Sequence, residues 1–153
     1  MSCPHERLPQ LTEEDAVRLI RAHGMVLEHE LDDSGDDGLL ESLRSWNSQL
    51  NHQAFEEVMA SIKVLGPQWS SSQSLSRPVM CGLWNIVSLG RGYVTNPDRA
   101  AHRKSHILDV HELNVEQRWL DAIDLAVQTF LECDDPVVAF TFYDEIVNDR
   151  ECC

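Results

Sequence analysis

Residues 55–67 read FEEVMASIKVLGP and carry the clearest structural signal in the chain. Spacings of three and four residues separate the apolar positions, which places them along one face of an α-helix. Gly66 and Pro67 come directly afterwards, and this pair is typical of a helix end. The stretch therefore predicts an amphipathic helix that buries one face in a protein core. Its core-facing residues are Phe55, Val58, Met59, Ile62 and Leu65.

The same helical spacing continues on both sides of this stretch. Before it, Thr12 can cap a helix that Gly24 interrupts, and a second helical pattern covers residues 39–50. After it, Ser76 can cap a helix that stops at Gly90. The loops between these elements are short, so we expect consecutive helices to pack against one another.

Two further helices are expected toward the C-terminus. The run 114–117 is a capping-box signature for the first of them. Asp135 and Pro136 then suit the N-cap and the first position of a last helix that reaches about Val147. This helix is apolar on most sides, so we expect it at the centre of the fold. Val137–Tyr143 is also rich in strand formers, and a strand there is the alternative.

These patterns predict an all-α fold, a single-domain bundle of about five to seven helices joined by short loops. No linker divides the chain, so residues 1–153 are expected to form one helical domain, with 1–10 and 148–153 as flexible ends. A chain of this length can bury enough surface to fold without a metal or a disulfide. Three tryptophans at helical spacing are expected in the core, namely Trp46, Trp84 and Trp119.

Hydropathy and cysteine usage indicate a cytoplasmic location. The first residues lack the apolar run of a secretory signal, and no run reaches the ~18 apolar residues of a membrane span. The five cysteines are odd in number and irregularly spaced, which suits reduced thiols. Cys81 and Cys133 lie in apolar helical stretches and are expected in the core. Cys152 and Cys153 resemble a double-cysteine prenylation tail, but the Gly-rich phosphate loop of a GTPase is missing, which favours an exposed terminus instead.

Charge is the main functional signal in the sequence. The formal net charge is −14 with neutral histidines, which argues against nucleic-acid binding because phosphate contacts need clustered Lys and Arg. Residues 12–50 carry ten acidic and three basic residues, and residues 114–153 carry ten acidic and two basic residues. The segment between them, 67–113, is mildly basic. Two acidic flanks of this kind favour encounters with a basic macromolecule.

We therefore predict a non-enzymatic acidic binding protein that neutralises or regulates a basic protein partner by occlusion, in the manner of immunity proteins, antitoxins and nucleic-acid mimics. The alternative is an acidic surface that only aids solubility. Trp69 lies in a Ser/Gln loop, where it is either an exposed binding anchor or a plug at one end of the bundle. The predicted partner-binding residues are Asp32, Asp33, Asp36, Asp37, Glu41, Trp69, Asp134 and Asp135.

Two other functions are alternatives to this prediction. His102 and His106 are four residues apart, and His111 and Glu112 follow, so a metal-binding helical enzyme could use these side chains. The signal lacks the HExxH pattern, and residues 32–43 match a calcium loop at neither its Gly nor its Glu position. We therefore expect no catalytic residue, no bound metal and no cofactor. The other alternative is a structural or regulatory homodimer formed through an apolar helix face.

Overall fold

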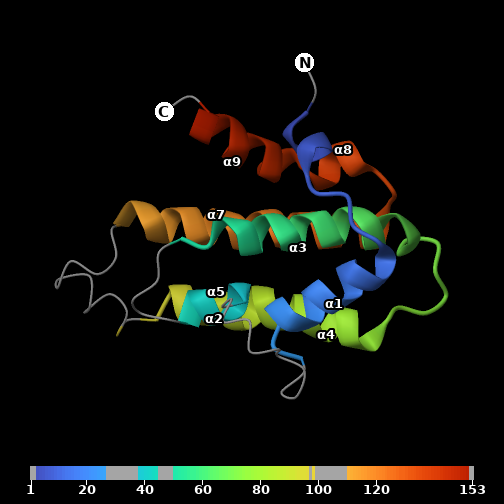
Figure 1. Ribbon diagram of the computed structural model, residues 1–153, viewed down its shortest axis with the longest axis horizontal. Coiled ribbons are helices and arrows are strands. Elements are labelled where there is room, and N and C mark those ends of the chain that lie inside the picture. The colour runs from blue at the N-terminus through green and yellow to red at the C-terminus, as the bar shows by residue number, and fades with distance from the viewer. Residues whose placement is uncertain (1–2, 27–37, 45–49, 97, 99–109, 152–153) are drawn as a thin grey trace.

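The computed structural model describes residues 3–26, 38–44, 50–96, 98 and 110–151, and all regular structure in these ranges is helical (Figure 1). The predicted all-α single-domain bundle is confirmed. The strand considered for Val137–Tyr143 is wrong, because this segment lies in α8 and α9. Within these ranges no helix combines the length and apolar content that crossing a bilayer requires. In chain order the elements are the 3-10 helix η1 (Pro4–Arg7), α1 (Glu13–His23), α2 (Leu39–Arg44), α3 (His52–Leu65), the 3-10 helix η2 (Gly66–Gln68), α4 (Arg77–Trp84), the π-helical turn η3 (Asn85–Leu89), α5 (Gly90–Val94), α7 (Val110–Glu132), α8 (Pro136–Ala139) and α9 (Thr141–Glu151).

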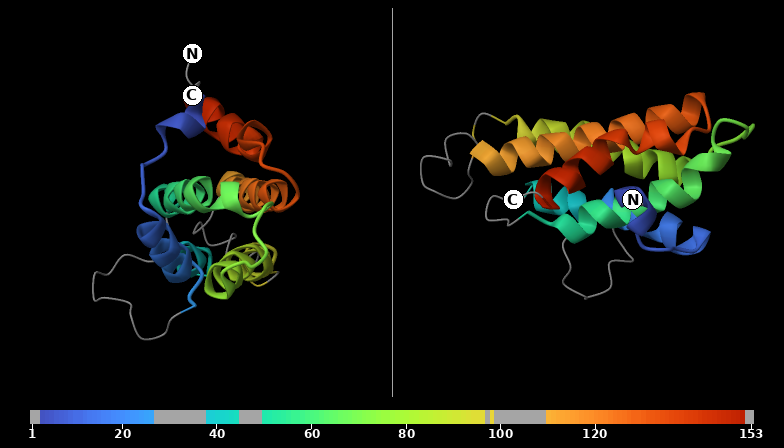
Figure 2. Two further views of the ribbon diagram at one scale, coloured as in Figure 1. Left: turned by 90° about the vertical axis from the view of Figure 1, so that its right-hand side faces the viewer. Right: turned by 90° about the horizontal axis from the view of Figure 1, so that it is seen from above.

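The helices stack in three layers (Figure 1, Figure 2). Helices α3 and α7 lie side by side in the middle layer, α1, α2, α4 and α5 cover one side of it, and η1, α8 and α9 cover the other. The last helix is therefore on the outside, and its expected central position is wrong. The reason is that α9 buries only one stripe, which includes Tyr143 and Ile146, and leaves Phe142, which precedes them, 41% exposed.

Side chains that accept backbone hydrogen bonds fix where several helices begin. The Thr12 hydroxyl accepts the backbone N–H of Asp15 at 3.1 Å at the start of α1. The side-chain Oδ1 of Asn51 accepts the backbone N–H of Ala54 at 3.1 Å at the start of α3, and Asp135 caps α8. These acceptors satisfy N–H groups that the first turn of a helix leaves unpaired, so capping residues visible in the sequence set the local boundaries.

An aromatic contact joins the two middle helices. Phe55 of α3 and Trp119 of α7 are fully buried and stack with ring centroids 4.9 Å apart and ring planes within 7°. Phe130 and Phe140 continue the aromatic core with an edge-to-face contact at 6.1 Å. Trp119 is in the core as predicted, and Trp46 lies outside the described residues. The helix stripe predicted for 55–65 is confirmed, with four residues buried and the last one partly buried: Phe55, Val58, Met59, Ile62 and Leu65.

Three residues that we expected in the core are exposed instead. Cys81 and Cys133 are free, exposed thiols, and Trp84 is 71% exposed. Consecutive residues of an α-helix point about 100° apart, so the burial of Leu83 turns Trp84 toward solvent. Cys133 directly follows the last residue of α7 and lies outside the packed face of that helix. Burial predicted from an apolar stretch of sequence is therefore too high where only one face of the helix packs against a neighbouring element.

Helices α1 and α4 meet at a pair of glycines. Gly24 lies at the C-cap of α1, so the predicted interruption there is confirmed. A β-carbon on Gly24 would lie 2.5 Å from the Cα of Gly82, and a β-carbon on Gly82 would lie 2.7 Å from the carbonyl oxygen of Ile20. The two backbones therefore touch at a point where only glycine leaves room.

A buried histidine links three helices below the middle layer. His23 Nδ1 accepts the backbone N–H of Leu39 at 3.1 Å, so the ring proton lies on Nε2. That nitrogen donates to Glu57 Oε2 at 2.9 Å, and Gln53 donates to the other carboxylate oxygen at 2.8 Å. These contacts tie α1, α2 and α3 together, so the polar groups buried there are satisfied.

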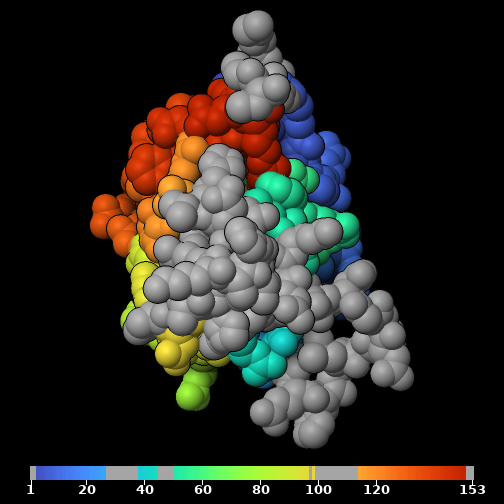
Figure 3. Space-filling view, turned by 90° about the vertical axis from the view of Figure 1, so that its left-hand side faces the viewer, coloured from blue at the N-terminus to red at the C-terminus, as the bar shows by residue number. Residues whose placement is uncertain are grey.

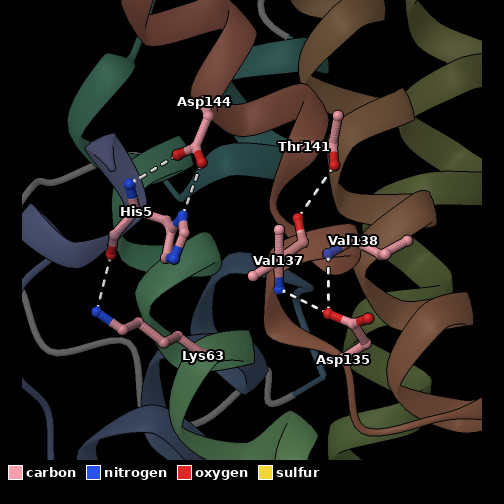
Figure 4. Close-up of polar contacts among 7 residues, drawn as sticks. All are labelled: His5, Lys63, Asp135, Val137, Val138, Thr141 and Asp144. Atoms are coloured by element: carbon pink, nitrogen blue, oxygen red, sulfur yellow. Dashed lines mark hydrogen bonds and ion pairs between the residues drawn. The ribbon is translucent and has the colours of Figure 1, made fainter. Parts of the chain in front are cut away.

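The N-terminal segment packs against α9. The backbone N–H of His5 donates to Asp144 Oδ1 at 2.7 Å, and the ammonium group of Lys63 donates to the His5 carbonyl oxygen at 2.8 Å (Figure 4). Leu8 joins the core. Residues 4–8 therefore belong to the packed domain and not to a free end, and residues 148–151 continue α9. In the space-filling view the surface of α9 lies next to that of the N-terminal segment (Figure 3).

Gly82→Ala is expected to lower the free energy of unfolding by about 1–3 kcal/mol, because the new methyl group meets a backbone oxygen that cannot rotate away. Gly92→Ala in α5 is the matched control, since nothing lies within 4 Å of a β-carbon at Gly92. Helix propensity there predicts a gain of about 0.5–1 kcal/mol. Urea denaturation measures both variants. If both are stabilised alike, the close contact of α1 with α4 is refuted.

Glu57→Gln is expected to make the free energy of unfolding depend less on pH in the acidic range. The hydrogen bond from His23 holds the pKa of Glu57 below its ordinary value of 4.5. A carboxyl whose pKa falls on folding stabilises the protein above its unfolded pKa, and this contribution disappears as the pH drops through the folded pKa. The substitution should therefore cost about 1 kcal/mol at pH 7 and much less at an acid pH below the folded pKa.

Glu56→Gln is the control for this experiment, because Glu56 is more exposed and lies 3.9 Å from Arg150. An exposed pair of this kind contributes less than about 0.5 kcal/mol. Urea denaturation at the two pH values measures all three proteins. A loss for Glu57→Gln that is as large in acid as at neutral pH would contradict the role of the carboxylate charge.

Candidate functional site

An exposed corner, residues 131–138, joins α7 to α8. Every residue in this α7–α8 corner is exposed, although it contains the large aliphatic side chains of Leu131, Val137 and Val138, of which Val137 is 68% exposed. Glu132 and Asp134 lie beside them, and no described residue forms a hydrogen bond or ion pair with either carboxylate. Apolar side chains that gather on a surface commonly mark a contact site. The corner is therefore a candidate binding surface.

A groove between α7 and α9 extends this surface. The Thr141 hydroxyl donates to the Val137 carbonyl oxygen at 3.0 Å, which links α8 to the start of α9 (Figure 4). Phe142 follows Val138 by four residues, about one helical turn, and lines a cavity of about 240 Å³. The α7–α9 groove is lined by Arg118, Asp121, Phe142, Glu145 and Ile146.

Carboxylates near the groove outnumber the cations that could neutralise them. Arg118 Nη2 lies 2.7 Å from Asp149 Oδ2, and Arg91 lies 3.1 Å from Asp121. Both cations are therefore already paired within the protein. The Glu145 carboxylate forms no hydrogen bond or ion pair with any described residue. The groove thus combines an exposed aromatic ring with an unneutralised carboxylate on the same helix.

The structure separates the predicted partner-binding residues into different regions. Glu41 lies on α2 and pairs with Arg44 at 2.8 Å, whereas Asp134 and Asp135 lie in the α7–α8 corner. The middle layer stands between α2 and α8 (Figure 1), so these residues do not form one surface with Glu41. The remaining predicted aspartates lie outside the described residues: Asp32, Asp33, Asp36 and Asp37.

Trp69 matches the second of its two alternative roles, the plug at one end of the bundle, because it is half-buried and packs against the core. Its ring meets Phe130 edge to face, with centroids 6.5 Å apart. Phe130 lies near the end of α7, so Trp69 closes the bundle at that end. Trp69 is therefore not freely exposed, and a contact of its ring with a partner stays a prediction. The exposed aromatic ring beside the acidic corner is Phe142.

The residues of the histidine-based metal hypothesis are only partly described. His102 and His106 lie outside the described residues, and for His111 and Glu112 only the backbone, within α7, is described. A metal site formed by these four residues therefore stays a prediction.

Phe142 and Glu145 were not predicted from the sequence, because the last helix reads as apolar on most sides. The signal that could have found them is the helical period. Burial of Phe140, Tyr143 and Ile146 defines one stripe, and residues two positions from its members point away from it. The helical period places Glu145 opposite this stripe and Phe142, four residues before Ile146, at the edge of it.

Comparison with known proteins assigns no function to this site. No family model, no curated protein and no solved structure matches the chain. The candidate site therefore depends on exposure, charge and packing alone.

Asp135→Ala is expected to lower the free energy of unfolding by about 1 kcal/mol, because Asp135 is an N-cap. Its Oδ1 accepts the backbone N–H groups of Val137 at 3.1 Å and Val138 at 3.3 Å (Figure 4). Asp134→Ala is the matched control and should change stability by less than about 0.5 kcal/mol. Urea denaturation compares the two variants. Equal losses would contradict the capping role of Asp135.

Proposed function

We propose that this protein is a non-enzymatic acidic binding protein that neutralises or regulates a basic protein partner by occlusion. The observation that carries the proposal is the combination of exposed apolar side chains with carboxylates that have no partner among the described residues, along the α7–α8 corner and the α7–α9 groove. Buried apolar anchors supply most of the affinity of an interface, and charges around them supply orientation and association rate. A partner segment with apolar residues flanked by Lys or Arg would complement both features.

Charge supports a basic protein over the other classes of partner. A net charge of −14 repels the phosphates of nucleic acids. A second copy of this chain is disfavoured for a related reason, because a symmetric contact through the corner would bring Glu132 and Asp134 close to the same carboxylates of the partner copy. A homodimer through this face is therefore an outcome that the experiment below can reveal and not the proposed function.

We place this binding in the cytoplasm. Cys3, Cys81 and Cys133 are free thiols, and free thiols suit a reducing compartment. The proposed mechanism needs no cofactor and no membrane contact, because binding alone covers the functional surface of the partner.

A cationic peptide tests the proposal. The probe is a synthetic amphipathic helix with Leu on one face and Lys on the other, and the reference peptide carries Glu in place of every Lys. Fluorescence anisotropy should show that the Lys peptide binds, that added salt weakens this binding, and that the Glu peptide does not bind. Glu145→Lys combined with Asp134→Lys should weaken binding of the Lys peptide at least tenfold at low salt. Phe142→Ser should weaken binding of the same peptide at least fivefold at every salt concentration.

The matched control is Glu13→Lys combined with Glu14→Lys at the start of α1. These residues are exposed, the change in net charge is the same, and α1 lies on the far side of the middle layer (Figure 1). This control should bind the Lys peptide nearly as well as the wild type does. Equal weakening by both double variants would show that only overall charge matters, and the acidic surface would then serve solubility. A dimer in light scattering that Phe142→Ser dissociates would identify a second copy as the occupant.

A further inference from the structure

Three side chains with metal-binding atoms meet where η1 packs on α9. Cys3 precedes η1, His5 lies within it, and Asp144 belongs to α9. One ligand atom from each residue, a thiol sulfur, an imidazole nitrogen and a carboxylate oxygen, can be chosen so that all three lie within 4.8 Å of one another. His5 and Asp144 are 139 residues apart in the sequence, so only the fold brings them together.

Two of these three ligands are already held in place. The Asp144 carboxylate accepts the backbone N–H of His5 at Oδ1, and its Oδ2 lies 2.7 Å from His5 Nδ1 (Figure 4). The imidazole ring stacks on Phe140 with centroids 5.3 Å apart, and Lys63 holds the His5 carbonyl oxygen. A site whose ligands are oriented before binding loses less conformational entropy when the ion arrives.

The third ligand is on the solvent side. Cys3 is an exposed free thiol, whereas His5 is buried and Asp144 is half-buried. This arrangement gives an ion a path from solvent to the two inner ligands. It also leaves one coordination position to water, because three protein ligands occupy only part of a tetrahedral shell.

The mixture of donor atoms selects the kind of ion. A thiolate, an imidazole and a carboxylate together suit zinc, whereas calcium and magnesium prefer oxygen ligands alone. Zinc bonds of about 2.0–2.3 Å place neighbouring ligand atoms of a tetrahedron roughly 3.3–3.7 Å apart. The three ligand atoms here are within 4.8 Å, so small side-chain rotations complete the geometry.

We propose that Cys3, His5 and Asp144 bind one Zn²⁺ ion at the contact between η1 and α9. The ion binds the Cys3 sulfur as a thiolate, so the thiol proton is released to solvent. It replaces the hydrogen bond between His5 and Asp144 with two coordinate bonds. Bound zinc therefore fastens the N-terminal segment to α9, and this proposal is independent of the binding function proposed for the groove.

Cobalt substitution tests the site directly. The full chain is used without a histidine tag, and Co²⁺ is the probe because a cobalt–thiolate bond absorbs in the near ultraviolet whereas free cobalt does not. One equivalent of Co²⁺ should produce this band, and Zn²⁺ should abolish it by displacement. Cys3→Ser should remove the band. Asp144→Asn keeps an acceptor for the backbone N–H of His5 and should weaken Co²⁺ binding at least tenfold.

Control variants separate this site from other ligands. Cys81→Ser and Cys133→Ser each remove another exposed thiol and should leave the band unchanged, and His102→Ala combined with His106→Ala should also leave it unchanged. Zn²⁺ should raise the melting temperature of the wild type but not of Cys3→Ser, and circular dichroism checks that every variant is folded. The proposal is overturned if the wild type shows no band, if folded Cys3→Ser keeps it, or if the histidine variant loses it.

Discussion

The stacking of Phe55 on Trp119 is the contact on which the rest of the structure depends. It joins α3 to α7, and each outer layer packs on one or both of these helices. His52 meets the same indole edge-on at 5.0 Å, and the Arg150 guanidinium carbon lies 5.9 Å from the ring centroid. Burial, followed by the nearby Arg150 charge, lowers the pKa of His52, which favours a neutral imidazole beside the cation. One buried indole therefore connects α3, α7 and α9.

Around this core, every acidic side chain whose burial is described, except that of Glu116, reaches the surface. The twelve basic residues are too few to pair with twenty-six acidic ones, and several of them are used inside the fold. Arg91 bridges Asp121 and Asp124, and Arg118 holds Asp149. In the part of the chain that the structure describes, carboxylates without a partner lie near exposed apolar side chains where α7 turns into α8. An acidic surface can serve solubility or the binding of a partner. Exposed apolar side chains beside the carboxylates favour binding.

Local sequence determined the helices and several of their boundaries. The stripe from Phe55 to Leu65 repeats at the helical period, so its burial follows from any arrangement that covers one face. Thr12 and Asp135 mark helix starts because a capping side chain needs only the backbone of the next turn. The acidic excess was equally visible, and it identified Asp134 and Asp135 as surface residues. All of these features depend on interactions among neighbours in the chain.

Tertiary packing alone decided which apolar faces stay uncovered and which distant residues meet. Trp84, Val138 and Phe142 resemble core residues by composition, but α4, α8 and α9 belong to the outer layers, and each has neighbours on one side only. Cys3, His5 and Asp144 come together because η1, at the start of the chain, packs on α9 at its end. Helical periodicity fixes the direction of a side chain relative to its own axis. The position of one helix relative to another depends on contacts between residues far apart in the chain, and no local pattern encodes those contacts.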